Sequence, residues 1–295
     1  MIPSRSRPGR HLRGGFMFKK KFEETGLQAL DELKIELPSW GFANTGTRFG
    51  KFMQDSAATS IEEKLSDAAM VHELVGCCPT VAVHVAWDFK AGGGNAPQVA
   101  ELASKLGISI GSINPTLFED QQYKYGSLGN PDPEIRKMAI GHIHDSIEIA
   151  KTVKSRDLVL WFADGSNYPG SANIRKRKAW FEEGLKQCAH SLLPSQRMLI
   201  EYKPYEPAFY HTDIADWGMS CLFARKCSPR AKVLVDTGHH YTSQNIEQIV
   251  AWLLSEDMLG GFHFNDRKYG DDDLTLGSID PYQMFRILNE IFSFT

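Results

Sequence analysis

Four residues with metal-ligating side chains lie in or just after apolar segments in the last third of the sequence. Glu201 lies in MLIEYKP, Asp236 and His239 lie in VLVDTGHH, and His263 lies in GGFHFND. Each has an ordinary alternative: a salt bridge between Glu201 and Lys203, a helix cap for Asp236, and a solvent-facing or core position for the histidines. A carboxylate in an apolar strand is costly unless a cation pairs with it, and three successive segments repeat the pattern. The repetition favours a shared metal site.

The acidic loop DRKYGDDDL follows directly and contains Asp271, Asp272 and Asp273. In an extended segment, Asp271 and Asp273 point the same way and Asp272 faces elsewhere, although a solvated acidic loop is the simpler alternative. Together with the earlier residues, this loop supplies enough ligands for two cations. Oxygen and imidazole ligands without a nearby thiolate favour Mn²⁺, Co²⁺ or Mg²⁺ over a structural zinc ion. Such ions can bind vicinal hydroxyl and carbonyl oxygens and polarise the carbonyl group.

These residues must be positioned by a repeating pattern of apolar strands and amphipathic helices. The helix expected over residues 60–76 begins with a capping box formed by Ser60 and Glu63. Strand and helix alternation with nearly continuous apolar strands predicts a parallel sheet. The seven expected strands span 39–45, 80–89, 107–115, 157–165, 197–204, 232–238 and 260–266.

We therefore predict the α/β class and a (β/α)8 TIM barrel that is incomplete, with seven strands and without the eighth strand and the C-terminal helices. An open doubly wound sheet is less favoured because no GxGxxG motif follows the first strand. In a barrel of this kind the active site lies at the C-terminal ends of the strands, which is where the ligand candidates occur.

Composition limits the remaining possibilities. The 295 residues are 42% hydrophobic, enough for one barrel, and the net charge of −3 gives little reason to expect a nucleic acid or a membrane as partner. Five scattered cysteines without a CxxC motif suit a reducing cytoplasm, and we assign them no chemistry. We expect a basic, disordered extension over residues 1–16 and a single truncated barrel domain over residues 17–295.

Four longer motifs carry a family resemblance: IEYKPYEPAFYHTDIADWG, VLVDTGHH, GGFHFNDRKYGDDDL and SINPTLFEDQQYKYGSLGNPD. From about residue 17 to about residue 290 the sequence resembles the broad-specificity bacterial L-rhamnose isomerases, relatives of the xylose-isomerase-like barrels. The resemblance implies an aldose–ketose isomerase that interconverts L-rhamnose and L-rhamnulose, with D-allose and D-psicose as a second pair. Both a hydride shift between C1 and C2 and a proton transfer through an ene-diol remain open.

The resemblance also implies roles for the residues that match. Glu201, Asp236 and His263 would hold a structural metal ion, with Glu201 placed to bridge toward the second ion. His239, Asp271 and Asp273 would hold a catalytic ion. Mn²⁺ is the first expectation for both ions.

Further matching residues are expected to line the sugar. They are Lys203, His84 in AVHVAWD and Trp161 in LVLWFADG, with Lys203 also counted among the catalytic groups. Phe49 in NTGTRFG would reach the site of a neighbouring subunit in a homotetramer. Ordinary core packing, ion pairing or loop packing is the alternative for each of these four.

One departure from the family concerns the ligand set. The family supplies a further aspartate from an eighth strand, and that strand is not found in this sequence. We therefore expect weak metal binding and slow turnover. The alternatives are an epimerase or an endonuclease on a related barrel, or a catalytically impaired sugar-binding or assembly partner.

Overall fold

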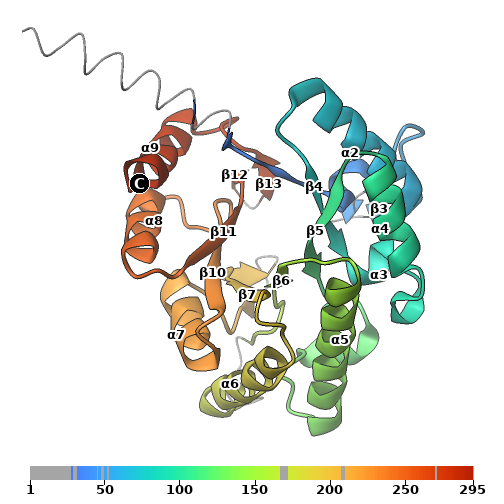
Figure 1. The fold of residues 1–295 in the computed structure, drawn as a ribbon. Coiled ribbons are helices and arrows are strands. Elements are labelled where there is room, and N and C mark those ends of the chain that lie inside the picture. The colour runs from blue at the N-terminus through green and yellow to red at the C-terminus, as the bar shows by residue number, and fades with distance from the viewer. Residues whose placement is uncertain are drawn as a thin grey trace, which may run out of the picture.

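A parallel sheet of seven strands forms the centre of the molecule, with helices around it (Figure 1). The computed structural model describes residues 28, 32–44, 46–47, 50–51, 53–166, 172–206, 210–269 and 271–294. Neighbouring strands pair in parallel in the order β1, β4, β5, β6, β7, β10 and β11. Their bounds are β1 (Glu36–Pro38), β4 (Thr80–His84), β5 (Ser109–Asn114), β6 (Asp157–Leu160), β7 (Arg197–Glu201), β10 (Ala231–Asp236) and β11 (Leu259–His263). This order confirms the predicted barrel class with seven strands.

Helices connect consecutive strands and cover the outside of the sheet. They are α2 (Ile61–Val75), α3 (Val85–Asp88), α4 (Ala96–Lys105), α5 (Pro133–Thr152), α6 (Ile174–His190), α7 (Trp217–Cys227), α8 (Ile246–Ser255) and α9 (Pro281–Ser293). The predicted cap of α2 is confirmed, because the Ser60 hydroxyl accepts a hydrogen bond from the Glu63 N–H at 3.2 Å. The Glu63 carboxylate in turn accepts the backbone N–H of Thr59 at 2.7 Å.

The strands are apolar because both of their faces are covered. Val233, Leu234 and Val235 of β10 are all buried, although alternate residues point to opposite faces of the sheet. One core lies around β6, β7 and β10 and a second around β4 and β5. These two cores hold the strand ends, and therefore the site residues, in fixed positions.

The first two predicted strands are wrong in their bounds, and the strands predicted over 157–165 and 197–204 end earlier, at Leu160 and Glu201. Residues 39–42 form the 3-10 helix η1 (Ser39–Phe42), and α3 begins directly after His84. The physical reason is the buried carboxylate of Asp88, which accepts hydrogen bonds from the Ser39 hydroxyl at 2.5 Å and the His84 N–H at 2.8 Å. The Lys64 ammonium compensates its charge at 2.6 Å. These contacts turn the chain where its apolar character alone indicated a longer strand.

Three short hairpins extend from the C-terminal side of the sheet. They are β2 (Gly46–Thr47) with β3 (Gly50–Lys51), β8 (Tyr205–Glu206) with β9 (Tyr210–His211), and β12 (Asn265–Lys268) with β13 (Asp271–Thr275). The predicted strand 260–266 is therefore two strands, β11 and the start of β12. The acidic loop is part of an antiparallel hairpin.

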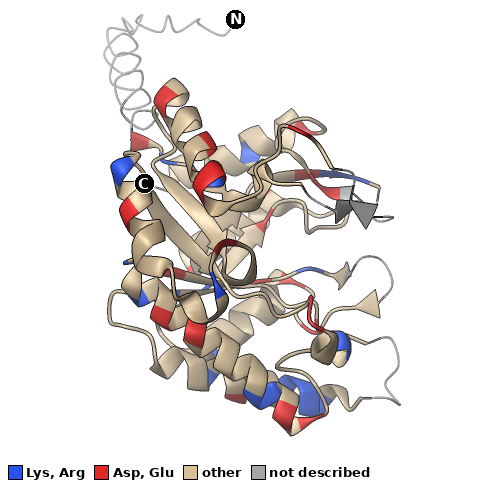
Figure 2. Cartoon of the chain, turned by 90° about the vertical axis from the view of Figure 1, so that its right-hand side faces the viewer, with Lys and Arg blue, Asp and Glu red and all other residues tan. Residues whose placement is uncertain are grey.

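Other expectations have simpler outcomes. All five cysteines are free, and the two sulfur atoms of Cys77 and Cys78 lie 3.9 Å apart. Within the described ranges, no helix has the length and apolar character needed to cross a bilayer. Acidic and basic residues are mixed along the outer helices in the view of Figure 2. The extension 1–16 and Phe49 lie outside the described residues.

Candidate metal centre

Three neighbouring strands end in potential metal ligands. Glu201 is the last residue of β7, Asp236 the last residue of β10, and His263 the last residue of β11. Asp236 and His263 are paired across the sheet, and Leu234 of β10 is paired with Glu201. Parallel strands present their carboxyl ends at one edge, so the fold itself brings these side chains together.

Glu201, Asp236, His239 and His263 form one group, which we call the ligand cluster. The Glu201 carboxylate lies between the two imidazoles, with Oε1 3.2 Å from His239 Nδ1 and Oε2 3.3 Å from His263 Nδ1. Asp236 Oδ2 is 3.6 Å from His239 Nε2. Glu201, Asp236 and His239 are each less than 10% exposed. The structure thus places four of the six predicted metal ligands together.

The charges of the ligand cluster depend on each other. Burial opposes protonation of His239, but Asp236 and Glu201 outweigh it and raise the pKa of His239 to about 9. Burial likewise opposes protonation of His263, and Glu201 raises its pKa to about 9. Burial alone would raise the pKa of Glu201, yet the two histidines hold it well below its usual range. Two carboxylates therefore require positive charge here, either from protonated imidazoles or from a bound cation.

The donor set fits a divalent cation. Glu201, Asp236 and His239 each offer one ligand atom, and these atoms lie within 4.8 Å of one another. Two carboxylates and an imidazole suit Mn²⁺, Co²⁺ or Mg²⁺. Asp236 is held in place by the Gly238 N–H at 2.7 Å and by Asn265 Nδ2 at 2.9 Å, as expected for a ligand that must not rotate.

Asn265 is a site residue that the sequence did not reveal. A signal was present, because Asn265 lies two residues after His263 and side chains two apart in an extended segment share a side. Its backbone N–H also donates to the Thr237 hydroxyl at 2.8 Å, which ties the start of β12 to the end of β10.

The acidic loop is placed differently from the expectation in one respect. Asp272, expected to face away, points to the site, and its Oδ2 is 2.9 Å from Lys203 Nζ and 3.9 Å from His239 Nε2. The pKa of Asp273 is raised, first by desolvation and then by the Asp272 carboxylate, while His239 acts against the rise. Asp271 begins β13, and its side chain lies outside the described part of the structure.

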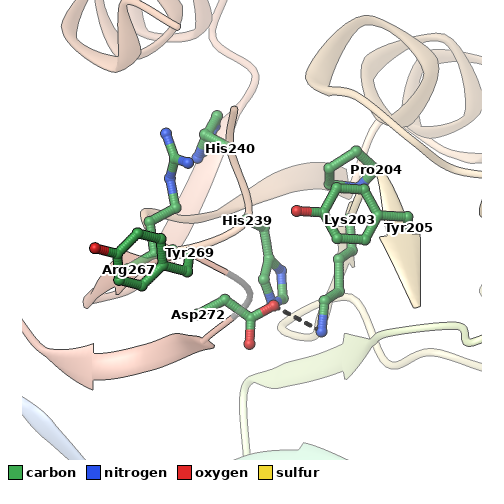
Figure 3. Close-up of a pocket in the computed structure, with 9 residues that line it drawn as sticks. Lys203, Pro204, Tyr205, His239, His240, Arg267, Tyr269 and Asp272 are labelled. Carbon is green, nitrogen blue, oxygen red and sulfur yellow. Dashed lines mark ion pairs between the residues drawn. The ribbon is translucent and has the colours of Figure 1, made fainter. Parts of the chain in front are cut away.

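A pocket opens directly beside the ligand cluster (Figure 3). In this view Arg267 and Tyr269 lie on one side, Tyr205 lies on the other, and His239 and Asp272 lie between them. The segment between β7 and β8, the start of β8, the loop after β10 and the β12–β13 hairpin all contribute. The full lining consists of Lys203, Pro204, Tyr205, Gly238, His239, His240, Arg267, Tyr269 and Asp272. A ligand in this pocket would contact the exposed side of His239.

Aromatic rings extend from the other half of the sheet. His84 ends β4, and its ring lies 4.0 Å from Trp87 and 4.9 Å from Trp40, measured between centroids. Its Nδ1 lies 3.1 Å from the Thr116 hydroxyl. Burial is the main reason that the pKa of His84 falls to about 3, so this imidazole is neutral near pH 7. Trp40 and Trp87 had not been singled out from the sequence.

Trp161 connects this aromatic group to the ligand cluster. It follows β6, and its ring lies 4.9 Å from Phe118. Lys203 Nζ lies 5.6 Å from the centroid of the Trp161 ring. Phe118 is in turn 6.0 Å from His84, so the rings form a continuous wall from His84 to Lys203. His84, Trp161 and Lys203 therefore lie along one side of the barrel mouth.

Comparison with known proteins identifies the family of this chain. Residues 79–292 match the family model described as the xylose isomerase-like TIM barrel. The "Probable sugar isomerase" of Mesorhizobium japonicum is 40% identical over 267 residues, which cover 89% of this chain and 61% of the relative. The "Probable sugar isomerase" of Rhizobium meliloti is 41% identical over 262 residues, which cover 87% of this chain and 60% of the relative. The chain thus spans about 60% of the length of the curated relatives it matches.

Solved structures show the same fold at lower identity. D-allulose 3-epimerase from Methylomonas sp. in complex with D-allulose superposes with a TM-score of 0.63 at 16% identity, over 88% of this chain and 81% of that chain. On the family match and the two sugar-isomerase relatives, the chain belongs to the xylose isomerase-like TIM barrel family.

Proposed function

We propose that this chain carries the active site of a divalent-metal-dependent aldose–ketose isomerase that interconverts L-rhamnose and L-rhamnulose. The observation that carries the proposal is the buried ligand cluster at the ends of β7, β10 and β11. The relatives named as sugar isomerases support the reaction class, since they align with 87% or more of this chain. The aldose itself rests on the motif resemblance.

Two ions are part of the proposal. Glu201, Asp236 and His263 would hold one ion, and His239, Asp271 and Asp273 would hold the other, with Mn²⁺ expected first. When bound, the ions would polarise the sugar carbonyl and orient the adjacent hydroxyl group. The contact of Glu201 with both histidines supports a carboxylate shared between the two ligand sets.

The protein side chains would fix the sugar. Lys203 is placed to donate a hydrogen bond to a sugar oxygen, and neutral His84 is able to donate or accept one. The Trp161 ring lies in the aromatic wall, and its buried indole N–H has no hydrogen-bond partner among the described residues. The aromatic wall with Phe118 suits the C6 methyl group of a 6-deoxy sugar, because a hydroxyl there would lose hydration without gaining a partner.

A ketose epimerase is the second candidate. The observation that favours it is the shared fold of the solved D-allulose 3-epimerase, which binds a ketose. An epimerase would convert one ketose into another, whereas an isomerase would convert an aldose into a ketose. The two reactions are therefore distinguished by the product.

The test uses metal-stripped protein with Mn²⁺, Co²⁺ or Mg²⁺ added back, and L-rhamnose or D-allulose as substrate. Carbon-13 NMR of the mixture identifies the product. L-rhamnulose formed from L-rhamnose, dependent on metal and absent in Glu201→Gln, is the expected result. A new ketose from D-allulose with no reaction of L-rhamnose would replace the isomerase by the epimerase.

Two further proposals accompany the function. We infer a homotetramer, which light scattering coupled to size-exclusion chromatography tests. We also infer a cytoplasmic location, and the five free cysteines support it because such thiols persist in a reducing compartment.

A further inference from the structure

Asp272 has a position that the proposed ligand sets do not explain. One atom of its carboxylate, Oδ2, is 2.9 Å from Lys203 Nζ and 3.9 Å from His239 Nε2. The Lys203 side chain is 12% exposed and that of Asp272 25% exposed. Because solvent screens this pair only in part, its charges act on the groups beside it.

Lys203 presents a difficulty for cation binding. Its ammonium group is held close to His239, a residue that would hold a divalent cation under the proposed function (Figure 3). Like charges a few ångströms apart in a sheltered site repel each other strongly.

The backbone fixes Asp272 at this place. A Cβ atom at Gly238 would lie 2.0 Å from the Asp272 carbonyl oxygen, so the main chain of β13 packs directly against the end of β10. Asp272 is thus carried to Lys203 by the packing of the main chain, and its carboxylate lies 2.9 Å from the Lys203 ammonium group. A carboxylate fixed in this way is suited to be a permanent counter-ion.

We infer that Asp272 is a positioning residue that neutralises and holds Lys203, so that a divalent cation can bind beside this ammonium group without Asp272 being a ligand. The inference rests on the proposed metal site. The competing possibility is that Asp272 itself ligates the cation. The two differ in whether the effect of Asp272 depends on Lys203.

A double-mutant cycle on the full chain separates them. Mn²⁺ affinity is measured by electron paramagnetic resonance for the parent, Asp272→Asn, Lys203→Met and the double variant. We expect Asp272→Asn to weaken Mn²⁺ binding by about tenfold or more. The Lys203→Met variant binds at least as tightly as the parent, and the double variant matches Lys203→Met.

Two results would overturn the inference while leaving the metal site intact. One is an equal loss on Asp272→Asn with and without Lys203, which would make Asp272 a ligand. The other is unchanged affinity of Asp272→Asn. A parent chain that binds no Mn²⁺ would instead remove the proposed function together with the inference.

Controls exclude a general effect of lost ion pairs or folding. Lys232 of β10 and Asp257, which lies just before β11, form another 2.9 Å pair, and Asp257→Asn should leave Mn²⁺ affinity unchanged. Asp272→Glu keeps the charge and should keep most of the affinity. Circular dichroism checks folding, and Asp272→Ser replaces Asp272→Asn in the cycle if the latter does not fold.

Discussion

Substituting Gly238 by alanine would push the β12–β13 hairpin away from the ligand cluster. Gly238 lies between Asp236 and His239, and an added Cβ would lie 2.0 Å from the Asp272 carbonyl oxygen and 3.1 Å from Asn265 Cβ. Ordinary contacts of a Cβ begin at 3.4 Å. Strand β13 would therefore have to withdraw by about 1.4 Å, the difference between 3.4 and 2.0 Å.

The size of the effect of Gly238→Ala depends on which atom has to move. The obstructing oxygen belongs to the main chain, so the strand shifts together with Asp272 and cannot relax by a side-chain rotation. Overpacking of this kind typically costs about 1–3 kcal/mol, roughly 2–5 °C in the thermal midpoint of a chain this size. A displacement of about 1 Å in an active site can reduce the rate of catalysis by about a hundredfold. We expect a comparable sensitivity at the metal site, with a fall in Mn²⁺ affinity of about tenfold to a hundredfold.

Gly261→Ala is the matched control. Gly261 lies on β11 in the same GGFHFND motif as His263, and a Cβ there would meet Leu199 Cδ1 at 3.6 Å, an ordinary contact. Both variants are compared with the parent by Mn²⁺ titration and by thermal unfolding without metal. If Gly238→Ala unfolds and binds Mn²⁺ as Gly261→Ala does, the hairpin does not pack on Gly238 and the reasoning is refuted.

Three other predictions address the rest of the molecule. Asp88→Asn leaves the buried Lys64 ammonium uncompensated and should lower the free energy of unfolding in urea by about 3 kcal/mol, with partial recovery in the double variant with Lys64→Met. The pKa of His84 is about 3 in the folded chain and about 6.5 in the unfolded chain. The free energy of unfolding is therefore highest above pH 6.5, where His84 is neutral in both states, and decreases toward pH 3 by up to about 1.4 kcal/mol per pH unit. Between pH 7 and pH 5, urea unfolding should show a smaller loss of stability for His84→Gln than for the parent. Mn²⁺ at about 100 times its Kd should raise the free energy of unfolding of the metal-stripped chain by about 2.7 kcal/mol, and the rise should disappear in Glu201→Gln.

The strands that carry the ligands were predictable because burial and chemistry act along the same short segments. In β7 and β10 the apolar run ends at the polar residue itself, so Glu201 and Asp236 marked the site, although the predicted strands ran on to residues 204 and 238. Parallel pairing then required their side chains to meet. The sequence was sufficient here because only strand direction and order had to be known.

The contacts that failed to be predicted depend on residues distant in the chain. The turn after His84 is set by Asp88, which meets Ser39 49 positions away. The inward position of Asp272 depends on Lys203 and on the absence of a side chain at Gly238. Neither periodicity nor local propensity contains such information, because it arises only when separate segments pack. The role of Asp271 and the expected weak metal binding remain predictions.

Different parts of the sequence supply the residues proposed to bind metal and those proposed to bind the sugar, so the two kinds of binding are separable by mutation. Every member of the ligand cluster comes from residues 201–263, at the ends of β7, β10 and β11 or in the loop after β10, whereas the aromatic rings come from residues 40–161, in the other half of the sheet. Among the described residues, Lys203 links the aromatic rings to the metal site, since it lies over Trp161 and pairs with Asp272. Changes in the aromatic half should therefore alter the sugar that binds while Mn²⁺ affinity is retained, and changes at Lys203 should alter both.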